Sequence, residues 1–165
     1  MATRFVLTPE SAQFPSSAFP QLLTIHSTER IYALAFDAAT VEGCRWRTIV
    51  PQGWTGTITA VITYCMASAT SGLVDFEMSV QSVSDGDALD IDAATSYDTV
   101  NTITAPTVPA TAGYIDQVTC TLTNNDSSAA GDWITFKLER DADDGTNDTA
   151  TGDAYVLSVE IRDGA

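Results

Sequence analysis

From Ile31 onward, short runs rich in Ile, Val, Thr, Tyr and Phe are separated by clusters of Gly, Pro, Asn and Asp. Such runs, bounded by turn-forming residues, are typical of β-strands. The pattern predicts eight strands, near residues 30–37, 44–50, 56–67, 72–83, 97–104, 113–123, 132–140 and 154–162. No long segment shows a capped helical period, so we expect neither βαβ units nor a parallel sheet.

Several of these runs alternate between apolar and polar residues, which indicates strands with one face turned to a core. The apolar faces predicted in this way are Ile58, Ala60, Ile62, Tyr64 and Met66; Val74, Phe76, Met78 and Val80; Ile134, Phe136 and Leu138; and Tyr155, Leu157, Val159 and Ile161. Amphipathic strands with connections of varied length predict an all-β fold, an antiparallel two-sheet sandwich that is jelly-roll-like, with about eight strands. A seven-stranded immunoglobulin-like sandwich is the alternative, but its Cys…Trp…Cys spacing is absent.

Residues 1–30 differ from the rest because they carry Pro9, Pro15 and Pro20 at a spacing that leaves little room for a helix or a central strand. We therefore predict an extended N-terminal arm over residues 1–30 and a β-sandwich domain over residues 31–165. The arm is too apolar for a free tail, so it lies either on its own sandwich or on a neighbouring subunit. The arm residues expected at a subunit interface are Phe5, Phe14, Phe19 and Leu22.

Charge narrows the possible partners. The 165 residues include 22 acidic and 7 basic ones, a formal net charge of −15, which argues against binding nucleic acid through its phosphates. The same charge favours a positively charged partner surface or divalent cations. The apolar stretch Phe5-Val6-Leu7 is too short for a signal peptide, and no window is apolar enough to span a membrane. We expect a soluble protein without a membrane role.

Residue types with catalytic or metal-binding chemistry are sparse or scattered. Cys44, Cys65 and Cys120 form no zinc motif and are expected to be buried, free side chains, although one pair remains possible. The single histidine, His26, is interpreted as a structural hydrogen-bonding residue. Asp75 and Glu77, two residues apart, are interpreted as part of a solvated sheet face and not as the carboxylate pair of a glycosidase. We therefore expect no enzyme activity.

Two acidic loops, residues 84–92 and 141–148, hold the candidates for calcium. The candidate ligands are Asp141, Asp143, Asp144 and Asp148. The second loop departs from the EF-hand pattern in the place of its glycine and in lacking a closing Glu. The favoured interpretation is that both loops are solvent-exposed turns. No cofactor is therefore expected, and bound calcium is the alternative.

Aromatic and basic residues supply two further candidates. Trp46, Trp54 and Trp133 are expected to pack in or at the edge of the core, with a sugar platform as the alternative. Arg45 and Arg47, which flank Trp46, form the densest basic spot in the chain. They are predicted to pair with acidic loops of a neighbouring subunit, or with acids of the same chain.

Over residues 30–162 the chain resembles small virion structural proteins of tailed bacteriophages. The likeness rests on these segments: Phe36-Asp37-Ala38, Pro51-Gln52-Gly53-Trp54-Thr55-Gly56-Thr57-Ile58-Thr59-Ala60, Asp85-Gly86-Asp87-Ala88-Leu89-Asp90, Arg140-Asp141-Ala142-Asp143-Asp144-Gly145 and Asp153-Ala154-Tyr155-Val156-Leu157-Ser158-Val159. The resemblance implies a β-sandwich without catalytic residues that is part of the virion.

The expectation from these observations is a capsid decoration (cement) protein, made in the host cytoplasm, that binds the major capsid protein on the capsid surface. A homo-oligomer is expected, with a trimer favoured, and the arm would latch onto a neighbouring subunit or the shell. The alternative is a tail or fibre module that binds a host-surface glycan through an exposed tryptophan, with Trp54 as the residue to test.

Overall fold

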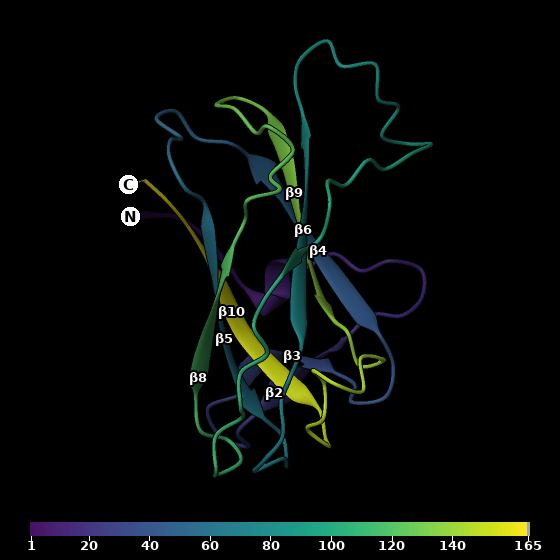
Figure 1. Cartoon of the computed structure of the whole chain (residues 1–165), viewed down its shortest axis with the longest axis vertical. Helices are drawn as coiled ribbons and strands as arrows, with labels where there is room; N and C mark the ends of the chain where they lie inside the picture. The colour runs from purple at the N-terminus through teal and green to yellow at the C-terminus, as the bar shows by residue number, and fades with distance from the viewer. Residues whose placement is uncertain (165) are drawn as a thin grey trace.

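Two antiparallel sheets face each other across an apolar core, as predicted for a jelly-roll-like sandwich (Figure 1). The computed structural model describes residues 1–164, which form ten strands and one short 3₁₀ helix, η1 (Pro9–Ser11). Sheet A contains β1 (Ala2–Leu7), β2 (Gln21–Ile25), β3 (Ile31–Phe36), β5 (Thr59–Met66), β8 (Asp116–Thr121) and β10 (Ala154–Asp163). Sheet B contains β4 (Glu42–Ile49), β6 (Phe76–Val83), β7 (Asn101–Thr102) and β9 (Trp133–Arg140).

The strand order explains how distant segments meet. Sheet A runs β2-β3-β10-β5-β8, with β1 pairing to β10, and sheet B runs β4-β9-β6-β7. Each of the eight predicted runs contains one strand, although β7 has only two residues. The C-terminal strand β10 lies inside sheet A, and β9 lies inside sheet B, so the last two strands of the chain organise both layers.

Most predicted core faces are confirmed. The apolar faces of β5, β6 and β9 all line the core, with every predicted residue on them 4% exposed or less. The prediction for β10 is wrong in its first half. A bulge between Val156 and Ser158 shifts the register against β5, so Val156, Val159 and Ile161 face the core and Tyr155 and Leu157 do not. One inserted residue reverses the alternation of a strand.

The N-terminal segment belongs to the sandwich of its own chain. β1 pairs with β10 from Ala2 to Leu7, and β2 pairs with β3 along its whole length. Of the two placements left open by the sequence, the structure shows the first. The prolines hid these strands because they lie between them: Pro9 opens η1, and Pro15 and Pro20 lie in the connection to β2.

A fully buried arginine ties the two layers together near one end of the sandwich. Arg140, at the end of β9, is 0% exposed and pairs with Asp148 through two hydrogen bonds of 2.8 Å. Its remaining N–H groups donate to the carbonyl oxygens of Phe36, Ala150 and Gly152. Because a buried charge is tolerated only when it is paired and hydrogen-bonded, this set of contacts explains how the guanidinium is accommodated.

The three cysteines are buried and free, as predicted. Burial raises the pKa of Cys120 to about 12, and the pKa of Cys44 is raised further, which leaves both thiols protonated near neutral pH. Within residues 1–164, no helix is long and apolar enough to cross a membrane.

Candidate functional site

The outer face of sheet B, which points away from the core, gathers side chains from three strands into four cross-strand rows. Strand register places Ile49, Trp133 and Val83 in the first row, and Arg47, Thr135 and Gln81 in the second. The third row holds Arg45, Lys137 and Ser79, and the fourth holds Gly43, Glu139 and Glu77. The first row is apolar and aromatic, the two middle rows contain the basic residues, and the fourth row is acidic.

Part of this face is buried, contrary to the expectation of a solvated sheet face. Asp75, Ser79 and Gln81 are 6%, 2% and 3% exposed, and Thr135 is 0% exposed. The connection from β6 to β7 brings Tyr97 onto the face, where its hydroxyl accepts a hydrogen bond from Arg45 Nε at 3.0 Å. The sequence placed Asp75 on this face but did not reveal that other side chains would shield it.

A hollow of about 370 Å³ lies at the apolar end, beside Trp133. Its lining residues are Ile49, Val83, Ser84, Asp85, Ile91, Gly131 and Trp133. An aromatic ring beside apolar side chains and a few polar groups is typical of a small-ligand site.

Buried Asp132 holds the rim of the hollow in place. Its carboxylate accepts hydrogen bonds from the hydroxyls of Ser82 and Ser84 and from the backbone N–H of Ala129, at 2.8–2.9 Å. Burial raises the pKa of Asp132, but these hydrogen bonds outweigh it and keep the pKa below its ordinary value. The ionised group therefore links the end of β6 to the turn before Trp133.

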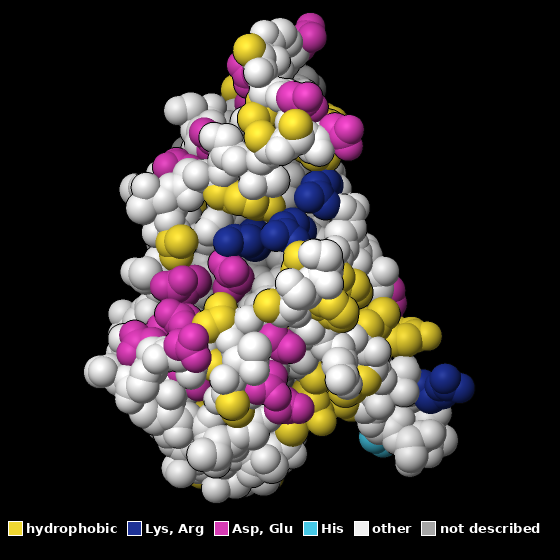
Figure 2. Space-filling view, turned by 90° about the vertical axis from the view of Figure 1, so that its right-hand side faces the viewer, with side chains coloured by type: hydrophobic (Ala, Val, Ile, Leu, Met, Phe, Trp, Pro, Cys, Tyr) yellow, Lys and Arg dark blue, Asp and Glu magenta, His cyan; other side chains and the backbone are white. Residues whose placement is uncertain are grey.

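Basic side chains cross the middle of the molecule in Figure 2, with acidic side chains gathered below them. The basic residues on this face of sheet B are Arg45, Arg47 and Lys137. Arg47 donates to the side-chain oxygen of Gln13, and its guanidinium carbon lies 5.7 Å from the Trp133 ring centroid. Lys137 Nζ lies 2.5 Å from Glu139 Oε2 and 5.1 Å from the Tyr97 ring centroid.

The acidic end of the face brings together Asp75, Glu77 and Asp141, whose nearest carboxylate oxygens all lie within 4.8 Å of one another. Burial and then the neighbouring carboxylates raise the pKa of Asp75 to about 6, and burial is also the largest cause of the raised pKa of Glu77. Three carboxylates at this spacing could contribute three of the six to eight oxygens that calcium takes.

The calcium candidates from the sequence are not gathered into one site. Asp141 lies in the acidic group just described, whereas the Asp148 carboxylate is bound by Arg140. Asp144 accepts hydrogen bonds from Thr146 and Asn147 within its own turn, and Asp143 is exposed. Asp75 and Glu77, which complete the group, come from β6 and its start, and sequence spacing alone could not bring them to Asp141.

The predicted interface residues of the N-terminal segment lie in two environments. Phe5 packs inside its own chain, with its ring centroid 6.1 Å from those of Trp54 and Phe136. Phe14 and Phe19 contact each other at 5.5 Å and are 38% and 40% exposed. Leu22, on β2, is 43% exposed. Phe14, Phe19 and Leu22 therefore have surface free for a partner, and their interface role stays a prediction.

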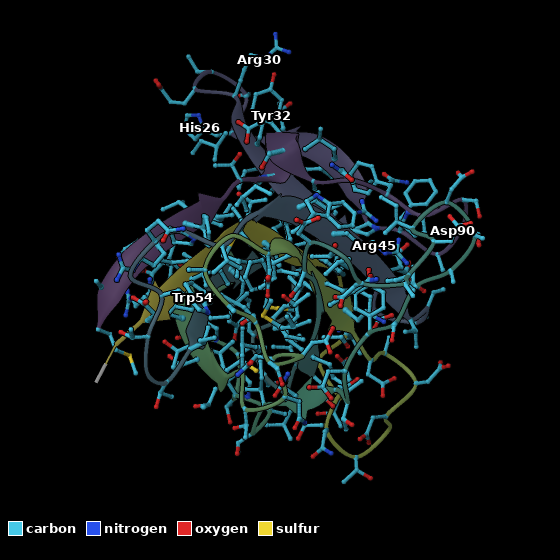
Figure 3. All side chains as sticks on the ribbon, turned by 90° about the horizontal axis from the view of Figure 1, so that it is seen from above. His26, Arg30, Tyr32, Arg45, Trp54 and Asp90 are labelled. Atoms are coloured by element: carbon cyan, nitrogen blue, oxygen red, sulfur yellow. The ribbon has the colours of Figure 1, made fainter. Side chains whose placement is uncertain are left out.

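The other sequence candidates lie away from the outer face of sheet B. Trp46 is 2% exposed and donates its indole N–H to the carbonyl of Thr8, as expected for core packing. Trp54 is half-buried against Phe5, and Figure 3 shows it on the opposite side of the molecule from Arg45.

His26 lies at the projecting turn between β2 and β3, together with Arg30 and Tyr32 (Figure 3). Its Nδ1 accepts a hydrogen bond from the Glu29 backbone N–H at 3.0 Å, which confirms the structural interpretation of this residue. The histidine is exposed, and its φ of 62° places it in the left-handed region used by tight turns.

No protein-family model and no curated protein matches this sequence. Solved structures do match its fold over nearly the whole chain. The CBM22-2 xylan-binding domain of Paenibacillus barcinonensis Xyn10C is 12% identical, with a TM-score of 0.55 over 97% of this chain and 99% of that one. CBM35 from Cellvibrio japonicus Abf62 is also 12% identical, with a TM-score of 0.54 over 98% and 94%.

The CBM22-1 xylan-binding domain of the same Paenibacillus enzyme is 15% identical, with a TM-score of 0.50 over 99% of this chain and 97% of that one. At these identities the likeness establishes the fold. The chain is an all-β, two-sheet sandwich of the architecture found in carbohydrate-binding modules.

Proposed function

We propose that this chain is a non-catalytic saccharide-binding module, and that the outer face of sheet B is its binding surface. The observation that carries the proposal is the hollow at Trp133, which has the polar side chains of Ser84 and Asp85 in its lining and which strand register places next to half-buried Arg47. Sugars present apolar C–H faces and hydroxyl edges, so a ring to stack on and polar groups at its side are the two features that bind them.

The fold likeness supports this proposal, because the two CBM22 domains that match this chain along its length are described as xylan-binding. The site itself comes from this chain alone. The aromatic residue proposed to bind the sugar is Trp133 at the hollow, and no longer Trp54, which packs against Phe5. No nucleophile or acid–base pair is assigned a role, so the proposal contains no reaction.

Isothermal titration calorimetry with xylan oligosaccharides and a wider glycan panel tests the proposal. Trp133→Ala should weaken binding by about tenfold or more, as alanine substitution of a stacking aromatic does at other interfaces. Tyr114→Ala is the matched control, because Tyr114 is 65% exposed and precedes β8 in sheet A. Equal loss in both variants, or no binding to any glycan, would refute the proposed function.

A second candidate is the virion role implied by the sequence resemblance, and one observation favours it. The apolar surface of Phe14, Phe19 and Leu22 is exposed on the N-terminal segment, where a protein contact would bury it. Deleting this segment is a poor test, because β1 and β2 are part of sheet A. Phe14→Ser with Phe19→Ser should instead reduce the mass measured by light scattering if these residues hold a trimer together.

A further inference from the structure

Two arginines on the outer face of sheet B lack an acidic partner in a strongly acidic chain. Within residues 1–164 four of the seven basic residues contact a carboxylate: Arg4, Lys137, Arg140 and Arg162. Arg45 and Arg47 do not, although the chain carries 22 acidic residues. The third such residue, Arg30, lies at an exposed turn.

The contacts that hold Arg45 and Arg47 leave their charges uncompensated. Arg45 donates to the hydroxyl of Tyr97, and Arg47 donates to the amide oxygen of Gln13 and lies over Trp133. All three partners are neutral. Both arginines are half-buried and project from the same face of β4, two residues apart, or about 7 Å along the strand. Two like charges held this close to each other favour an anion between them.

A second unmet polar group lies at the same place. Thr135 Oγ1 is the one buried side-chain nitrogen or oxygen atom within residues 1–164 that has no hydrogen-bond partner. Thr135 is the cross-strand neighbour of Arg47 on β9, and the alternation of β9 places it on the same face. Buried hydroxyls are rarely left without a partner, and each exception calls for an explanation, such as an ordered water or a bound ion.

We propose that the saccharide bound on this face carries an anionic substituent, a carboxylate or a sulfate, which is held by Arg45 and Arg47. This inference rests on the proposed function and specifies its ligand class. The planar guanidinium groups bind such oxygens through paired hydrogen bonds, which a neutral hydroxyl cannot match. Because Ser79, Gln81 and Thr135 are buried, the anion contacts these rows through the half-buried side chains of Arg45 and Arg47, next to the sugar ring that stacks at Trp133.

The acidic end of the face sets the direction of the ligand. Asp75, Glu77 and Glu139 lie beyond the basic rows, so an anionic group displaced toward them is repelled. The hollow at the other end is largely apolar and takes an uncharged ring. The net charge of −15 opposes the approach of any polyanion, so the site selects a sugar with an isolated charge over a densely charged chain.

Calorimetry on the full chain with a matched ligand set tests the inference. The ligands are a xylan oligosaccharide, the same oligosaccharide bearing glucuronic acid, the methyl ester of that acid, and a sulfated oligosaccharide. The acidic ligand should bind about tenfold more tightly than the neutral one and its ester. Arg45→Gln with Arg47→Gln should remove this preference, whereas Arg30→Gln, with an unpaired arginine outside the site, should retain it.

The possible failures are distinguishable. Equal affinity for neutral and acidic ligands, with both lost in Trp133→Ala, would overturn the anionic inference and leave the proposed function standing. Binding to no saccharide would overturn both. Tighter binding of the sulfated ligand than of the carboxylated one would support anion binding by the two arginines and identify the anionic group as a sulfate. If no ligand binds and the arginine variant instead lowers the molecular mass in solution, acidic loops of a second copy occupy the site and the inference is wrong.

Discussion

Two groups of arginine residues in this chain differ in how completely their surroundings satisfy them. Arg140 is fully buried, pairs with Asp148 at 2.8 Å and donates to three backbone carbonyls. Arg45 and Arg47 are half-buried, have only neutral partners and lie beside the unpartnered hydroxyl of Thr135. The Arg140 guanidinium is fully paired within the folded chain, whereas Arg45 and Arg47 have hydrogen-bonding capacity left for a ligand.

The positive charge of Arg140 is neutralised by Asp148 of the same chain, so replacement of Arg140 should alter stability. The charges of Arg45 and Arg47 should alter binding more than stability. Variants that remove polar groups one at a time test whether this division holds.

The largest effect is expected for Arg140→Met. Removing the guanidinium leaves Asp148 as an unpaired buried carboxylate, which should lower the free energy of unfolding by about 3–5 kcal/mol. Arg45→Met is the matched control and should cost about 1 kcal/mol, since it loses one hydrogen bond to Tyr97. Urea unfolding monitored by tryptophan fluorescence measures both. Similar losses in the two variants would remove the distinction between the groups.

A smaller effect, which depends on pH, is expected for Asp75→Asn. The pKa of Asp75 is about 6, above the ordinary 3.8, because of burial and the carboxylates of Glu77, Asp144, Asp141 and Asp148. The folded state therefore binds the proton more tightly than the unfolded state, and this contribution to stability is full below about pH 4 and lost as the pH rises through 6.

Asp75→Asn removes that loss. The variant should melt at a higher temperature than the wild type at pH 7.5, and the difference should shrink toward pH 4. Thermal unfolding in a calorimeter across this pH range, in the presence of a chelator, measures it. A variant that is less stable than the wild type at pH 7.5 would show that the ionised carboxylate stabilises the fold.

The smallest effect is expected for Thr135→Val. Valine keeps the shape and removes a hydroxyl that has no partner, so the free energy of unfolding should rise by about 1 kcal/mol. Thr63→Val is the control, because Thr63 Oγ1 accepts a hydrogen bond from Gln117 at 3.0 Å and its loss should be mildly destabilising. Destabilisation of both to the same degree would mean that the Thr135 hydroxyl is satisfied in solution.

Local alternation predicted most of the fold. The core faces of β5, β6 and β9 follow from period-two patterns that each strand carries in its own sequence. The pattern failed at β10, where the bulge after Val156 depends on pairing with β5, and at β1 and β2, where the prolines between the strands masked them. Each failure occurs where a contact with another strand determines the structure.

The candidate site was less predictable for the same reason. Arg45 and Arg47 stood out as a basic pair, and Trp133 was one of three tryptophans expected to pack in or at the edge of the core. Their meeting depends on the register of β4 against β9, which no single segment encodes. Trp54 was the tryptophan named for a test of glycan binding, but its ring packs against Phe5 on the other side of the sandwich.

The most direct test of saccharide binding by sheet B is an NMR titration of the full ¹⁵N-labelled chain with the best ligand from the glycan panel. Binding at this face should give concentration-dependent shifts at the indole N–H of Trp133 and at the amides of Gln81, Thr135 and Arg47, with no shift at the indole N–H of Trp54. Shifts confined to sheet A, or to the Trp54 indole, would contradict it.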